Sequence, residues 1–117
     1  MTEQPLTFVE RLLAHASGSY PAEAAVFVVA GAVRGTLPAK IALAINDYPD
    51  EEWAFIDWEY ALELSASFSS GERRLIALAA SLGSTHEVNL GDALSGLDET
   101  NADIVLDALA HALRIAR

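Results

Sequence analysis

The most apolar stretch of the chain is Ala24-Ala25-Val26-Phe27-Val28-Val29-Ala30-Gly31-Ala32-Val33. Ser19 followed by Tyr20-Pro21 supplies a side-chain cap and an early proline, which predicts a helix from about residue 20 to residue 33. The stretch has no polar face, so we expect this helix to be central and covered on all sides. Its β-branched residues leave a strand as the alternative. At about ten residues it is roughly half as long as a membrane-spanning helix, so it predicts a core element.

Helix caps recur on both sides of this stretch. Thr7 with Glu10 is a capping-box pattern that predicts a first helix ending before Gly18. Ser69 with Glu72 repeats the pattern before an amphipathic segment that closes at Gly83. Further helices are expected at about 38–45, 57–64, 90–94 and 98–115.

The expected fold is therefore all-α, an irregular bundle of five to six short helices around an apolar central helix. The segment 46–50 predicts a loop, and 53–58 begins either extended or helical. One helical domain accounts for residues 1–117, with residues 1–6 as a flexible tail.

Charge and cysteine content limit the function. Seventeen acidic residues against seven basic ones give a formal charge of −10, which disfavours direct binding to nucleic acids and to anionic membranes. The chain has no cysteine, which removes disulfides, thiolate catalysis and thiolate zinc sites. Met1-Thr2-Glu3-Gln4-Pro5 has no basic residue before an apolar run, so we expect no secretory signal and a cytoplasmic location.

The most distinctive segment runs from residue 48 to residue 60, where aromatic and acidic side chains alternate. Both tryptophans of the protein lie in it. Large rings bordered by charge are typical of a protein-binding patch, because a few rings can supply most of the affinity. The alternative is that Trp53, Ile56 and Tyr60 pack the core while the acidic residues face water. The residues predicted to bind a partner are Tyr48, Glu51, Glu52, Trp53, Phe55 and Trp58.

Candidate catalytic and metal-binding groups are few. Asp103, Asp107 and His111 share one face of the last helix, a spacing that could supply metal ligands but is more typical of a solvated helix face. His15 is interpreted as a boundary residue of the first helix, and His86 as an exposed loop residue. No Gly-x-Ser-x-Gly nucleophile elbow occurs. We therefore expect no catalytic residue, no metal and no cofactor.

Two segments, Ser70-Gly71-Glu72-Arg73 and Ser95-Gly96-Leu97-Asp98, resemble the signature and post-Walker-B segments of ABC-type ATPases. That family holds phosphates with a glycine-rich loop ending in Gly-Lys-Ser/Thr, whereas Lys40 is the one lysine here and has no such loop. We interpret the similarity as coincidental, because helix capping explains both segments.

The region from residue 53 to residue 111 resembles a group of small uncharacterised actinobacterial proteins. The segments that carry the resemblance are Ile56-Asp57-Trp58-Glu59, Ser70-Gly71-Glu72-Arg73 and Asp92-Ala93-Leu94-Ser95-Gly96-Leu97-Asp98-Glu99-Thr100-Asn101. The resemblance implies a helical domain and brings no known activity.

Three functions follow, in order of preference. The first is a non-enzymatic protein-interaction or regulatory module that binds a protein partner or forms a homo-oligomer. The second is an acidic mimic that blocks a basic, nucleic-acid-binding surface of another protein. The third is a small enzyme that uses carboxylates or a histidine.

Overall fold

The computed structural model describes residues 4–117 and is mostly helical. In that part of the chain the helices and strands are α1 (Phe8–Ala16), α2 (Tyr20–Gly35), α3 (Leu37–Lys40), η1 (Ala42–Ala44), β1 (Ile45–Tyr48), η2 (Pro49–Glu51), β2 (Trp53–Ile56), α4 (Trp58–Ser65), α5 (Ser70–Gly83), α6 (Leu90–Leu94) and α7 (Glu99–Ala112), where η marks a short 3-10 helix. Among residues 4–117, no helix is long and apolar enough to cross a membrane. Residues 1–3 of the expected tail lie outside the described residues, and the Leu6 carbonyl accepts a hydrogen bond from Arg11 at 2.7 Å.

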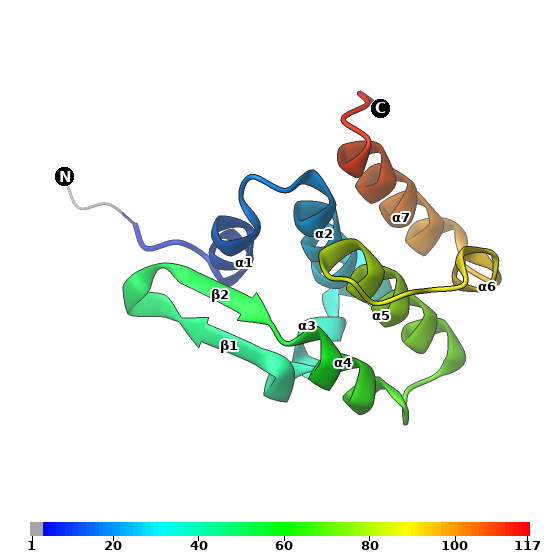
Figure 1. Ribbon diagram of the computed structural model, residues 1–117, viewed down its shortest axis with the longest axis horizontal. Helices are drawn as coiled ribbons and strands as arrows, with labels where there is room; N and C mark the ends of the chain where they lie inside the picture. The colour runs from blue at the N-terminus through cyan, green and yellow to red at the C-terminus, as the bar shows by residue number, and fades with distance from the viewer. Residues whose placement is uncertain (1–3) are drawn as a thin grey trace.

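The apolar stretch forms the helix α2, not a strand. Six of its residues are buried, and it packs against α1, α3, α5 and α7. Figure 1 shows α2 with α1 on one side and α7 on the other. Ser19 caps it as expected, through a hydrogen bond from the Ala22 N–H to the Ser19 hydroxyl.

The last turn of α2 is not helical. Ala32 has extended dihedral angles, and Val33 and Arg34 have φ of 52° and 56°. A β-branched residue rarely adopts a positive φ. The conformation is supported by Asn101 on α7, whose side-chain oxygen accepts a hydrogen bond from the Val33 N–H at 2.8 Å.

Most of the predicted caps are confirmed. Thr7 with Glu10 and Ser69 with Glu72 form complete capping boxes. Two further caps are present in the structure, Asn89 for α6 and Asp98 for α7. Helix ends were predicted less well. The expected helix at 38–45 is only four residues of α-helix followed by η1, and α7 ends at Ala112 instead of residue 115.

The all-α prediction is wrong in one element, a two-stranded antiparallel hairpin. Ile45 pairs with Ile56 and Tyr48 with Trp53, so part of the expected loop at 46–50 is β1 and the ambiguous start of 53–58 is β2. The hairpin projects from the helical part of the molecule (Figure 1). Ala54 and Ile56 face the core, while Trp53 and Phe55 point to the other face and are half-buried.

Candidate functional site

One face of the hairpin and the neighbouring α1 together form a continuous row of rings, which we call the aromatic row: Tyr48, Trp53 and Phe55 from the hairpin, and His15 from α1. Trp53 stacks on Tyr48, its cross-strand partner, with ring centroids 4.6 Å apart. On its other side Trp53 stacks on His15 of α1 at 5.4 Å and lies 5.7 Å from Phe55. None of these four residues belongs to the buried core or to the half-buried residues packed against it.

The structure thus brings three of the predicted partner-binding aromatic residues together and separates the fourth. Trp58, the first residue of α4, makes no ring contact with the aromatic row and packs against the hydrophobic core. Tyr60 is 39% exposed, so it is not the core residue that the alternative interpretation required. The tryptophans therefore have different environments, Trp58 on the core side and Trp53 on the surface side.

Three exposed carboxylates occupy the end of the hairpin, which we call the acidic tip: Asp50, Glu51 and Glu52. Glu52 has a left-handed backbone, with φ of 63°, and this conformation turns the chain into β2. Glu51 accepts a hydrogen bond from the Trp53 indole N–H at 3.0 Å. The predicted carboxylates Glu51 and Glu52 are therefore next to the row of rings.

An ion pair joins the hairpin to α1. The Arg11 guanidinium donates two hydrogen bonds to the Asp47 carboxylate, at 2.7 and 2.8 Å. These bonds hold the pKa of Asp47 below its usual range and raise the pKa of Arg11. Because Arg11 and His15 are four residues apart on α1, the same helix both anchors β1 and supplies a ring to the aromatic row.

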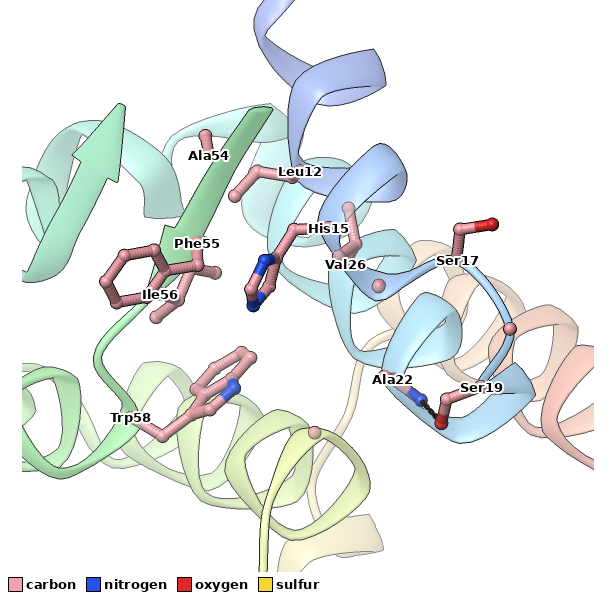
Figure 2. Close-up of a pocket in the computed structure, with 13 residues that line it drawn as sticks. Leu12, His15, Ser17, Ser19, Ala22, Val26, Ala54, Phe55, Ile56 and Trp58 are labelled. Atoms are coloured by element: carbon pink, nitrogen blue, oxygen red, sulfur yellow. Dashed lines mark hydrogen bonds between the residues drawn. The ribbon is translucent and has the colours of Figure 1, made fainter. Parts of the chain in front are cut away.

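Behind the aromatic row lies a cleft of ≈ 470 Å³ between α1, β2, and the starts of α2 and α4. His15 and Trp58 point into it from opposite walls, and Phe55 lines it from β2 (Figure 2). Its floor is apolar, with Leu12, Val26 and Ile56. The loop Ser17-Gly18-Ser19 and Gly83 at the end of α5 complete its rim.

Sequence reasoning missed the parts of the site that depend on long-range contacts. His15 is exposed, as a boundary residue would be, but its stacking on β2 could not be predicted from α1 alone. Gly83 was interpreted only as a helix stop, whereas a Cβ there would lie 2.7 Å from the Trp58 indole nitrogen. Gly83 and Trp58 are far apart in the sequence, so no local pattern around Gly83 signals this contact.

The three side chains on one face of the last helix, Asp103, Asp107 and His111, do not contact the same residue. Asp103 and Asp107 both pair with Arg117, while His111 turns to α2 and lies 3.1 Å from Glu23. Within residues 4–117 no group of three or more histidine, aspartate or glutamate side chains is placed to hold a metal ion. His111 and Glu23 do not line the cleft. His86, expected to be exposed, is half-buried.

The two segments that resemble ABC ATPases are neighbours in space. The Arg74 guanidinium on α5 reaches the Ser95 carbonyl at 3.4 Å and the Asp92 carboxylate at 3.6 Å. Ser69 and Asp98 use their side chains to cap α5 and α7. Both segments therefore have a structural role as helix starts.

Comparison of this chain with protein-family models, with curated proteins and with solved structures found no match, so the resemblance to small actinobacterial proteins stays a prediction.

Proposed function

We propose that the protein is a non-enzymatic interaction module and that its hairpin is the part that contacts a protein partner. The observation that carries the proposal is the aromatic row, whose rings stack on one another while staying outside the hydrophobic core. Rings already held in place lose little side-chain entropy on binding, and aromatic residues are enriched among the contacts that dominate affinity.

The charges around the aromatic row indicate the sign of the charge on the partner's binding surface. The acidic tip places three carboxylates beside the rings, and the chain as a whole carries a formal charge of −10. A positively charged surface would be attracted to this hairpin over the distance at which salt screens charges, about 10 Å at 0.1 M. Two copies of the hairpin would repel each other, so a basic partner fits better than self-association through this face.

The test compares capture from native lysate by matched variants. The Trp53→Ala bait removes the central ring of the row, and the double variant Glu51→Gln/Glu52→Gln removes two charges from the tip. The matched control is Glu59→Gln/Glu63→Gln, which removes two exposed charges from α4, at the other end of the hairpin from the tip (Figure 1).

A partner of the hairpin should bind the native protein and the α4 control, lose binding to Trp53→Ala, and bind the tip variant more weakly. Its retention should also fall between about 50 and 300 mM salt, because rim charges are screened. Equal retention by all baits would contradict the proposal. If retention falls in both the tip variant and the α4 control but not in Trp53→Ala, the result would favour the second candidate function, an acidic mimic of a nucleic acid.

A further inference from the structure

The cleft has the size and walls of a small-molecule site. Its volume of ≈ 470 Å³ falls within the range of ligand pockets, roughly 300–1,000 Å³. Three aromatic side chains line it, His15, Phe55 and Trp58, over an apolar floor. Faces of aromatic rings favour stacking and edge contacts with other flat rings. The shape and lining therefore favour a planar aromatic molecule.

The cleft also offers a free hydrogen-bond donor. Within residues 4–117 no group accepts a hydrogen bond from the Trp58 indole N–H, in contrast to the Trp53 N–H, which bonds to Glu51. No fully buried side-chain nitrogen or oxygen in the described residues lacks a partner, so the Trp58 nitrogen is not fully buried. Figure 2 shows this nitrogen on the ring edge that is turned toward Ala22. Gly83 lies along the same edge, since a Cβ there would be 2.7 Å from the nitrogen.

The charge of the lining limits the ligand further. None of the acidic side chains of residues 4–117 lines the cleft, although the chain carries a formal charge of −10. A cation would find no carboxylate there, and an anion would be repelled by the field of the whole protein. The lining thus fits a neutral molecule.

We propose that the cleft binds a neutral, planar aromatic molecule whose carbonyl oxygen accepts a hydrogen bond from the Trp58 indole N–H. The cleft shares His15 and Phe55 with the aromatic row, but binding of a small molecule there does not require that the hairpin binds a protein partner. The ring of the ligand lies between His15 and Trp58, which enter the cleft from opposite walls (Figure 2).

The absence of a side chain at Gly83 leaves room for the Trp58 ring that forms one wall of the cleft. A Cβ at residue 83 would lie 2.7, 2.9 and 3.0 Å from three atoms of the indole ring, so any larger residue displaces Trp58. Gly71 on the same helix offers a matched control, because a Cβ there meets nothing within 4 Å. Ala22 lines the cleft from α2 and allows a second variant, Ala22→Leu, which fills part of the cleft without changing a residue of α5.

The test uses coumarin as the probe and nitrogen-15 NMR as the measurement. The two tryptophans should give two indole N–H signals. The signal that is lost in Trp53→Phe belongs to Trp53, and the one that remains belongs to Trp58. We expect coumarin to shift the Trp58 signal downfield to saturation, with a Kd of about 1 mM or tighter, and the Trp53 signal much less. The negatively charged coumarin-3-carboxylate should bind more weakly than coumarin.

Variants of cleft residues test whether coumarin binds in the cleft. Gly83→Ala and Ala22→Leu should each weaken coumarin binding about tenfold or more, a loss of about 1.4 kcal/mol. Gly71→Ala and Ala102→Leu, an exposed position on α7, should bind within about twofold of the native protein. Absence of a saturable Trp58 shift, stronger binding of the carboxylate, or equal binding by cleft variants and controls would each overturn the proposal. If Gly83→Ala fails to fold, Ala22→Leu decides.

Discussion

Truncation of the two tryptophans tests the division between surface and core. Trp58 packs against the hydrophobic core and is in close contact with Gly83, so Trp58→Ala leaves a cavity. Such substitutions cost about 3 to 5 kcal/mol, and because Trp58 is only half-buried we expect about 3 kcal/mol.

Trp53→Ala removes stacking between rings but no core packing. The Trp53 ring stacks on Tyr48 and His15 and lies beside Phe55, and ring pairs of this kind on a sheet contribute roughly 0.2–1 kcal/mol each. We therefore expect the variant to be less stable by about 1 to 1.5 kcal/mol. At about 4 °C per kcal/mol for a chain of this length, the melting temperature should fall by about 5 °C in Trp53→Ala and about 12 °C in Trp58→Ala.

The assay is thermal and urea denaturation followed by far-UV circular dichroism, which does not depend on tryptophan. Leu106→Ala, at a leucine that is 49% exposed, is the control for truncation of a surface side chain and should change stability by less than about 0.5 kcal/mol. If Trp53→Ala destabilises the protein as much as Trp58→Ala, the aromatic row is part of the core and cannot supply ready binding contacts.

Three further predictions concern single contacts. Arg11 lowers the pKa of Asp47, so this carboxylate stabilises the fold above about pH 4. The stabilisation is lost as the pH falls through the lowered pKa. The urea midpoints of Asp47→Asn and of the native protein should therefore differ at neutral pH and converge in acid. Arg34 is exposed with φ of 56°, so Arg34→Gly should raise stability by about 0.5 to 1 kcal/mol, measured by thermal denaturation. Asn101→Ala leaves the Val33 N–H without its acceptor and should cost about 1 to 3 kcal/mol in the same assay.

Each of these has its own control or contrary result. Arg73→Gly replaces an exposed arginine inside α5 and should destabilise by about 1 kcal/mol, opposite in sign to Arg34→Gly. Asn101→Asp keeps a side-chain oxygen and should be milder than Asn101→Ala. A urea difference for Asp47→Asn that persists unchanged in acid would show that the Arg11 ion pair is not its cause.

Local sequence patterns are sufficient to predict where most helices start. A capping box joins residues three apart, as Thr7 with Glu10 and Ser69 with Glu72, so it can be recognised without the rest of the fold. Helix ends depend on distant partners. The end of α2 is determined partly by Asn101 on α7, and nothing near Val33 in the sequence shows this contact.

The hairpin could not be predicted because its usual pattern is missing. A half-buried strand normally alternates apolar and polar residues, but Trp53-Ala54-Phe55-Ile56 is apolar on both faces. Ala54 and Ile56 pack on the core, whereas Trp53 and Phe55 lie in the aromatic row that His15 joins from α1. β1 contains Asn46 and Asp47, which are typical of turns, and Asp47 is accommodated in a strand by its bonds to Arg11.

The candidate site could be predicted from composition only in part. Composition indicates the segment that holds both tryptophans, and its residues Tyr48, Trp53 and Phe55 do lie together. Composition could not separate Trp58 from them, because it does not show that the hairpin ends at Ile56 and that Trp58 is the first residue of α4.

The two-stranded sheet has a consequence for solubility. In the part of the chain that the structure describes, each strand has one edge whose backbone groups have no strand partner. Exposed edges next to large rings are sites at which copies of a protein can pair into aggregates. The carboxylates of the acidic tip and the proline at residue 49 oppose such pairing, because charge and proline both disfavour the addition of another strand. Replacement of these carboxylates, or their protonation in acid, should therefore make the hairpin the first part of the molecule through which it aggregates.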